Sequence, residues 1–354
     1  MKRVFFVMST NDVSGAERVN FNIINCLKDN YEFYWVSKRG KINEYLSDNN
    51  IKWIEIEKLN VKEIRKIIKE FNPDIIHATD YKASVICSIA KRNTYLIEHL
   101  HNNAPWIRKV CINSFAFLFA ALRADKILTV SNSIRNEYIF SKLIKDKIEM
   151  IGNPVDRKMI LDRIEKDDYE NKYDICCVAR LTEAKNPKRF LDIIKKIKNE
   201  IKDVKAVWVG EGELFEMAIQ YRDKLDLKKN VEFVGFKNNP YKYMAKSRVF
   251  LLTSDWEGYG LVTFEAMTIG LPCVVSNVGG LLEIVDEKCG KLCNENIEFE
   301  EETLKLLTER CYYENKSKEA VKKTKKIENA EEYIKKVNRI YKSTNKEMKN
   351  GGKK

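Results

Sequence analysis

The chain has 354 residues, of which 44% are hydrophobic, and a formal net charge of +12. This length predicts two domains, because single hydrophobic cores stop growing at about 250–300 residues. No apolar run is long enough for a transmembrane helix. The closest candidate, residues 112–122, predicts a buried helix, with a membrane-dipping helix as the alternative. Residues 1–8 lack the apolar core and cleavage site of a signal peptide, so we expect a first strand there.

Short apolar runs alternate with amphipathic helical patterns, such as 17–27 and 61–71, along the whole chain. The first half predicts strands at 4–8, 33–36, 53–56, 75–77, 95–97, 126–130 and 148–151. The second half predicts strands at 175–178, 206–209, 231–234, 249–252 and 273–275. Strands that alternate with helices indicate parallel sheets covered on both faces. The predicted fold class is therefore α/β, with two facing units that bind ligands at the carboxyl ends of their strands.

The charged segment 161–172 has no strand pattern and is the predicted linker between domains 1–160 and 173–330. We expect residues 331–354 to form a helix and a basic, disordered tail. From Glu314 to the C-terminus, 14 Lys and Arg face six Glu. This charge fits either a solvated helix face or attraction to anionic lipid head groups. We expect no nucleic-acid partner, because no binding motif accompanies the charge.

Nine cysteines are scattered along the chain, and their spacing fits no zinc site. Cys289 and Cys293 lie four positions apart, but no second cysteine pair or histidine pair completes such a site. Several cysteines fall within predicted apolar elements, where a thiol behaves as a small hydrophobe: Cys26, Cys87, Cys176, Cys177 and Cys273. The pattern predicts a reduced, cytosolic chain.

Polar residues follow several predicted strands of the first half. The loop Ser14-Gly15 after the first strand suggests close approach of backbone to a ligand or a tight turn, and it is not the G-x-G-x-x-G of dehydrogenases. The three histidines, His77, His99 and His101, all fall at or beyond strand ends. A structural role is the ordinary explanation for a lone histidine, but three at one sheet edge favour a site. Metal binding by His99 and His101 is an alternative without an obvious carboxylate partner.

Two loops of the second half carry cations and glycines. Arg180 stands at the end of a predicted strand and Lys185 just before a helix, where they suit a diphosphate leaving group. A helix-capping or surface role explains Lys185 equally well. Gly210 follows the next strand, and Gly235 the one after; these loops frame a nucleotide base or are simple turns. The sequence contains no Asp-x-Asp, which argues against a divalent metal on the diphosphate.

The segment 256–267 is the most informative of the chain. A buried strand, a glycine loop and a short apolar helix aim backbone N–H groups and the positive helix end at a phosphate. Glu257 lies on the loop and Glu265 about one turn into the helix, where a carboxylate can accept both hydroxyls of a ribose.

Together these segments resemble the group 1 retaining glycosyltransferases of family 4, which have the two-domain GT-B fold. The resemblance covers nearly the whole chain. Its most specific part is Glu257-x7-Glu265 with the downstream run 270–285; the segments 14–18, 130–133, 152–156 and 180–186 add to it. Three positions depart from the family pattern: Ser14 and Ala179 replace glycines, and Thr79 stands where a second histidine often follows His77.

The resemblance implies roles for individual residues. Arg180 and Lys185 would hold the donor diphosphate, Glu265 the ribose, and Glu257 the donor sugar or reacting region. His101 would lie near the transferred sugar, with His99 as its rival. The remaining donor-side residues implied are Gly15, Gly210, Gly260, Leu261 and Val262, and the acceptor side is assigned to His77, His99 and Asn102.

The family implies a metal-independent enzyme without a cofactor that moves a hexose or N-acetylhexosamine from a nucleotide-diphosphate sugar, with UDP ahead of GDP. The acceptor would be a glycan or lipid-linked glycan of bacterial surface polysaccharide synthesis. We expect a cytoplasmic protein that contacts the inner membrane face through its basic C-terminus. The alternatives are a sugar-nucleotide epimerase or phosphorylase on the same plan, and a glycan-binding protein without turnover.

Overall fold

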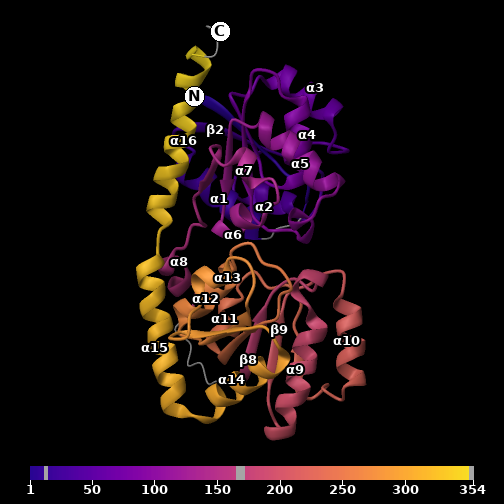
Figure 1. Ribbon diagram of the computed structural model, residues 1–354, viewed down its shortest axis with the longest axis vertical. Coiled ribbons are helices and arrows are strands. Elements are labelled where there is room, and N and C mark those ends of the chain that lie inside the picture. The colour runs from indigo at the N-terminus through magenta and orange to yellow at the C-terminus, as the bar shows by residue number, and fades with distance from the viewer. Residues whose placement is uncertain (12–14, 165–171, 351–354) are drawn as a thin grey trace. The chain divides into compact units, whose positions relative to one another are not determined.

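The computed structural model describes residues 1–11, 15–164 and 172–350. The chain divides into two compact units. Unit 1 comprises Met1–Pro154 and Asn329–Lys354, and unit 2 comprises Val155–Glu328. Each unit has its own parallel sheet with helices on its faces (Figure 1).

Unit 1 contains, within its described residues, a seven-stranded parallel sheet in the order β3-β2-β1-β4-β5-β6-β7. The central strands β4 and β5 are fully buried, which explains their continuous apolar sequences, whereas the edge strands β3 and β7 are partly exposed. The strands are β1 (Lys2–Val7), β2 (Tyr31–Ser37), β3 (Lys52–Glu55), β4 (Ile75–Ala78), β5 (Tyr95–Leu100), β6 (Lys126–Thr129) and β7 (Ile148–Met150). The helices are α1 (Gly15–Leu27), α2 (Ile42–Asp48), α3 (Val61–Phe71), α4 (Tyr81–Ala90), η1 (Pro105–Arg108, a 3₁₀ helix), α5 (Ile112–Arg123), α6 (Asn132–Glu137), α7 (Ser141–Ile144) and α16 (Ala330–Asn350).

The strand order of unit 1 reverses between β1 and β4. Ligands of doubly wound sheets bind at this point, outside the carboxyl ends of the strands. There the backbone N–H of Ser9, after β1, donates to Oδ2 of Asp80, after β4, at 2.9 Å. Asp80 also caps α4 by accepting from the N–H of Ala83 at 2.8 Å. The Asp80 carboxylate thus links the segments after β1 and β4, at the sheet edge where the predicted unit 1 residues lie.

The last helix, α16, belongs to unit 1 although it follows unit 2 in the chain. Figure 1 shows it (yellow) running along the side of unit 1. Its side chains Tyr333, Val337 and Tyr341 are buried, and Nζ of Lys2 donates to the backbone carbonyl of Tyr341 at 2.8 Å. The helix expected within 331–354 is therefore present as α16, and it belongs to unit 1. The apolar stripe of α16 packs on the unit 1 sheet, a contact that local sequence does not reveal. Residues 351–354 lie outside the described residues.

Unit 2 contains, in its described part, a six-stranded parallel sheet in the order β10-β9-β8-β11-β12-β13. The strands are β8 (Tyr173–Val178), β9 (Ala206–Val209), β10 (Val231–Phe233), β11 (Ser247–Leu252), β12 (Cys273–Ser276) and β13 (Gly290–Cys293). The helices are α8 (Arg157–Asp162), η2 (Glu183–Lys185, a 3₁₀ helix), α9 (Pro187–Glu200), α10 (Phe215–Lys224), α11 (Tyr241–Ala245), α12 (Leu261–Ile269), α13 (Leu281–Ile284), α14 (Asn296–Thr308) and α15 (Arg310–Ile327). The order reverses between β8 and β11, so the loops after these two strands meet at the switch point.

The α/β class and all twelve predicted strands are confirmed, with ends shifted by a few residues. The prediction missed β13, because Gly-Lys-Leu-Cys is short and half polar. The units meet in sequence between Pro154 and Val155, ahead of the expected linker 161–172. Part of that segment, 165–171, lies outside the described residues, and its first two residues belong to α8.

Two expectations about apolar segments need correction. The helix predicted at 112–122 forms as α5, but it is not buried all round: Ile112, Phe115, Phe119 and Leu122 are exposed. Cys26 is also exposed, whereas Cys87, Cys176, Cys177 and Cys273 are buried free thiols as expected. None of the helices in the described ranges combines the length and apolar character that a membrane span requires.

Candidate active site

The loops after β8 and β11 lie side by side at the switch point of the unit 2 sheet. The hydroxyl of Thr253, after β11, donates to the carbonyls of Lys185 and Asn186, both at 3.2 Å. The N–H of Asp255 donates to the carbonyl of Ala184 at 2.9 Å. These bonds fix the loop that carries Lys185 against the loop that carries Glu257.

Lys185 and Glu257 are in direct contact across these two loops. Nζ of Lys185 donates a hydrogen bond to Oε2 of Glu257. Their side chains are only 19% and 14% exposed. The second oxygen, Oε1, accepts from the N–H of Gly258 at 3.2 Å. The sequence predicted donor-side roles for both residues, and the structure brings them together although 72 positions separate them.

A glycine-rich turn precedes α12, as the sequence predicted. Gly260 caps the helix with φ of 86°, in the left-handed region that favours glycine. A Cβ on Gly280 would lie 2.4 Å from the carbonyl oxygen of Gly258, so the turn before α13 packs directly on this loop. Leu261 and Val262 form the first turn of α12, whose N–H groups have no partner within a helix. They are therefore available to an anion at the positive helix end.

Glu265 lies on the second turn of α12, where the sequence placed it. The hydroxyl of Tyr241, on α11, donates to Oε1 of Glu265 at 3.1 Å. This contact orients the carboxylate. Tyr241 was not predicted as a site residue, because α11 carries no motif and the contact arises only when α11 packs on α12.

Arg180 and Gly210 lie on the loops beyond β8 and β9. Arg180 is exposed, with the freedom that a ligand-binding cation needs. Gly210 has φ of 144°, and a Cβ there would lie 2.0 Å from the carbonyl oxygen of Ala179. The N–H of Leu181 donates to the carbonyl of Glu211 at 3.0 Å. Close packing of two loops thus already requires a glycine at 210, and a donor role for it stays a prediction.

The three histidines of unit 1 form a chain that starts at α16. The Tyr341 hydroxyl lies 2.7 Å from Nδ1 of His77, and Nε2 of His77 lies 3.1 Å from Nδ1 of His99. The rings of His99 and His101 follow at a centroid separation of 3.9 Å. Tyr341 had no local signal in the sequence, since it is an ordinary apolar position of an amphipathic helix.

The three histidines differ in access to solvent. His77 and His99 are fully buried, whereas His101 is half-buried. Desolvation lowers the pKa of His77 to about 3, and it also lowers the pKa of His99 and His101. All three rings are therefore neutral near pH 7. Of the three, only His101 keeps some exposed surface, but its Nε2 is buried and has no hydrogen-bond partner among the described residues, so the ligand roles expected of the histidines stay predictions.

The other unit 1 candidates lie near these histidines or at the start of α1. Asn102 is exposed, and its carbonyl accepts from the hydroxyl of Tyr81 at 3.0 Å. Gly15 opens α1 in open space, with nothing within 4 Å of a Cβ placed on it. The expected loop partner Ser14 lies outside the described residues.

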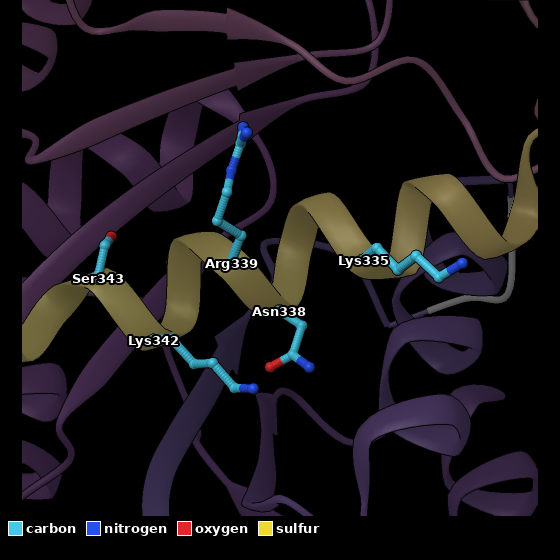
Figure 2. Close-up of a pocket in the computed structure, with 5 residues that line it drawn as sticks. All are labelled: Lys335, Asn338, Arg339, Lys342 and Ser343. Atoms are coloured by element: carbon cyan, nitrogen blue, oxygen red, sulfur yellow. The ribbon is translucent and has the colours of Figure 1, made fainter.

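Figure 2 shows a pocket along α16 that contains none of these residues. It is lined by Lys335, Asn338, Arg339, Lys342 and Ser343. Two of its polar side chains are engaged: Arg339 pairs with Glu149 at 2.6 Å, and Asn338 accepts from the hydroxyl of Tyr31 at 2.8 Å. In the described part of the chain, no three His, Cys, Asp or Glu side chains gather closely enough to hold a metal ion.

Two family models account for most of the sequence. Glycosyl transferases group 1 matches residues 160–327, and Glycosyltransferase Family 4 matches residues 13–158. The chain belongs to these glycosyltransferases. Its two switch-point sheets and the paired loops of unit 2 are therefore parts of a sugar-transferring enzyme.

Individual relatives of the glycosyltransferase agree with this. The UDP-Gal:alpha-D-GlcNAc-diphosphoundecaprenol alpha-1,3-galactosyltransferase of Escherichia coli is 39% identical over 113 residues, 31% of this chain and 29% of that protein. This match spans less than a third of that relative. An uncharacterized glycosyltransferase of Haemophilus influenzae is 27% identical over 313 residues, 84% of this chain and 87% of that protein.

The fold of the glycosyltransferase is also that of solved relatives. The crystal structure of Anabaena HepE in complex with UDP and glucose matches 97% of this chain and 100% of that chain, with a TM-score of 0.85 and 18% identity. At this identity the likeness concerns the fold, and it confirms the expected GT-B class.

Proposed function

We propose that this glycosyltransferase moves a hexose or N-acetylhexosamine from a UDP-sugar to a lipid-linked glycan in bacterial surface polysaccharide synthesis. The observation that carries the proposal is the contact between Lys185 and Glu257 at the switch point of unit 2. It gathers a cation, a carboxylate and the start of α12 at one sheet edge. A donor diphosphate needs the cation and the helix start, and a hydroxyl of the donor sugar can donate to the carboxylate.

The proposed donor site follows from this arrangement. Arg180, Lys185 and the N–H groups of Gly260, Leu261 and Val262 hold the diphosphate, and Glu265 accepts the ribose hydroxyls. Lys185 leaves or shares its bond with Glu257 when the diphosphate arrives. The preference for UDP is supported by the E. coli relative, whose name gives UDP-Gal as donor, and by HepE, which was crystallised with UDP and glucose.

The proposed reaction retains the configuration of the sugar. The bond between the anomeric carbon and the diphosphate oxygen breaks, and the acceptor hydroxyl oxygen bonds to that carbon from the same face. The acceptor proton passes to the leaving diphosphate. Two cations and a helix N-terminus stabilise the negative charge that develops on this leaving group, so the reaction needs neither a metal ion nor a cofactor.

The acceptor side is proposed to lie in unit 1, with His101 beside the transferred sugar and Asn102 next to the acceptor. The E. coli relative is named for a diphosphoundecaprenol-linked acceptor, which supports a lipid-linked one here. We place the protein in the cytoplasm, in contact with the anionic inner face of the membrane. The basic C-terminus is the element that the sequence suggests for this contact.

A donor panel with a lipid-linked acceptor tests the proposal. UDP-galactose, UDP-glucose, UDP-N-acetylglucosamine and GDP-mannose are compared by thermal shift, because a bound donor raises the melting temperature by mass action. Transfer and nucleotide release are then followed with the donor that binds. The anomeric proton coupling of the product reports retention or inversion. EDTA is expected to leave the rate unchanged, and a loss that Mn²⁺ restores contradicts metal independence.

The variants Glu265→Ala and Lys185→Ala provide the residue-level test. Each is expected to abolish transfer while the protein stays folded, and unchanged turnover in both refutes the assigned site. Incubation with the UDP-sugar alone separates transfer from epimerisation, because only an epimerase changes the sugar without an acceptor.

A further inference from the structure

One face of α5 exposes large apolar side chains to solvent. Ile112, Phe115 and Leu122 are 86%, 53% and 53% exposed, and Phe119 lies between them on the same face. The spacing of these four residues, i, i+3, i+7 and i+10, places them on a single stripe of the helix. The opposite side packs on unit 1 through Ser114, Phe117, Ala120 and Ala121. A soluble surface rarely exposes such a continuous stripe unless it has a partner.

Neighbouring segments extend this stripe, which we call the α5 face (Val110, Ile112, Phe115, Phe119 and Leu122). The ring of Phe140, just before α7, lies 5.0 Å from that of Phe115. Leu143 on α7 is exposed as well. The apolar area therefore continues from α5 onto the segment that lies beside it.

The charge around the α5 face is positive. Residues 105–124 contain Arg108, Lys109 and Arg123 and no Asp or Glu. Lys109 is exposed at one end of α5, and Lys142 is exposed on α7. The carboxylates of Glu137 and Asp125 pair with Arg108 and Lys91. An apolar stripe with a basic border suits an anionic lipid surface, where apolar side chains enter the acyl boundary and cations meet head groups.

The length of α5 decides how such a helix would sit. Its 12 residues span about 18 Å, less than the ~30 Å of a bilayer's hydrocarbon core. The helix can therefore lie along the membrane surface and cannot cross it. Its buried side remains packed on unit 1, so binding needs no unfolding.

The α5 face is connected to the acceptor side of unit 1. Phe117, on the buried side of α5, packs edge-on against Tyr81 at a centroid distance of 4.9 Å. The hydroxyl of Tyr81 donates to the carbonyl of Asn102, next to His101. A lipid surface at the α5 face would thus lie against the same part of unit 1 that carries His101.

We propose that the α5 face docks the protein on an anionic phospholipid bilayer. This assigns the membrane contact to an exposed helix face of unit 1 in place of the basic C-terminus. It does not depend on the proposed donor chemistry, and it is tested without any sugar substrate.

Vesicle co-sedimentation of the full chain tests this assignment. Vesicles of phosphatidylcholine alone are compared with vesicles that contain about a third phosphatidylglycerol. The double variant Phe115→Ser/Phe119→Ser is expected to lower partitioning into anionic vesicles about tenfold or more. The variant Lys109→Glu/Lys142→Glu is expected to lower it by at least about tenfold, and to leave the weak binding to neutral vesicles unchanged.

Two controls make the result specific. Met217→Ser/Ile297→Ser removes two exposed apolar side chains from α10 and α14 of unit 2, and is expected to bind within about twofold of wild type. Removal of residues 351–354 is also expected to leave binding unchanged. Loss of binding in this truncation, with normal binding of Phe115→Ser/Phe119→Ser, refutes the proposal in favour of the C-terminus.

Other outcomes also decide the matter. A wild-type chain that ignores anionic vesicles overturns the proposal. The proposal is also overturned if light scattering detects a wild-type dimer and the Phe115→Ser/Phe119→Ser variant is a monomer with unchanged vesicle binding. The α5 face then contacts a second copy of the chain. Sugar transfer to a short glycan without lipid is measured in parallel. Vesicle binding without any transfer contradicts the proposed function and leaves the α5 assignment standing.

Discussion

The hydroxyl oxygen of Tyr341 lies 2.7 Å from Nδ1 of His77, although 264 positions separate the two residues. The C-terminal helix therefore begins a hydrogen-bonded chain that runs through His77 to His99, whose ring packs on that of His101. The Tyr341 hydroxyl can donate or accept, so the chain has two possible proton directions, and each fixes the tautomers of His77 and His99 together. A change at Tyr341 should therefore alter the tautomer of His99, whose ring packs on that of His101.

Tyr341→Phe is expected to lower the free energy of unfolding by about 1–2 kcal/mol, because it leaves a buried nitrogen of His77 without its partner. Tyr333→Phe is the matched control. Tyr333 is also buried on α16, but within the described residues its hydroxyl has no hydrogen-bond partner. Its removal should be neutral or stabilising. Urea denaturation of both variants measures the difference, and equal losses would show that the Tyr341–His77 bond contributes nothing.

Acid should destabilise unit 1 through the buried histidines. The pKa of His77 is about 3 in the folded protein, against an unfolded value of 6.5. Below pH 6.5 the unfolded chain binds a proton that the folded chain excludes, so stability falls as pH falls, by about 1.4 kcal/mol per unit for this residue. His77→Phe, whose ring can stack on Phe6 as the imidazole does, should show a shallower loss between pH 7 and 5. Parallel slopes of wild type and variant would contradict this.

Glu98 should have the opposite pH dependence. It is fully buried on β5, and desolvation raises its pKa to about 8. Between pH 4.5 and 8 the folded chain holds a proton that the unfolded chain has lost, so this group lowers stability as pH rises, by about 1.4 kcal/mol per unit. Glu98→Gln should therefore be more stable than wild type at pH 8. The control Glu302→Gln weakens a buried pair with Lys316 and should lose stability; a similar loss in Glu98→Gln would refute the expectation.

The Lys185–Glu257 contact predicts different effects for its two partners. In Glu257→Gln the amide oxygen remains a neutral acceptor for Lys185, and no carboxylate balances the positive charge of Lys185. UDP should therefore bind as tightly as to wild type or tighter. Transfer should still fall by about 10²-fold, if Glu257 acts on the reacting sugar. Lys185→Ala should weaken UDP binding and cost about 1–2 kcal/mol of stability, because Glu257 loses its partner. Calorimetric UDP titration and transfer rates separate the two; weaker UDP binding in Glu257→Gln would contradict the assignment.

Local sequence was sufficient for every described strand except β13 and for the strand–loop–helix segments of unit 2 that carry the candidate site residues. Short continuous apolar runs, as in β8 and β11, predict strands that are buried on both faces. The strand–glycine loop–helix pattern around Glu257 and Glu265 needs only short-range geometry. The helix α5 shows where this stops. Both of its sides are apolar, so periodicity predicted the helix and could not say that Phe117 is buried and Phe115 exposed.

The sequence by itself determined the α/β class, the two sheets, the family and the residues at the unit 2 switch point, because each depends on neighbours within about ten positions. Tertiary structure alone decided which histidine is accessible, that Tyr241 orients Glu265, and that Lys185 meets Glu257. It also decided that the charged C-terminal segment is a helix of unit 1 whose Tyr341 reaches His77. These relationships join residues from 24 to 264 positions apart, and such contacts depend on how elements pack, which no local pattern encodes.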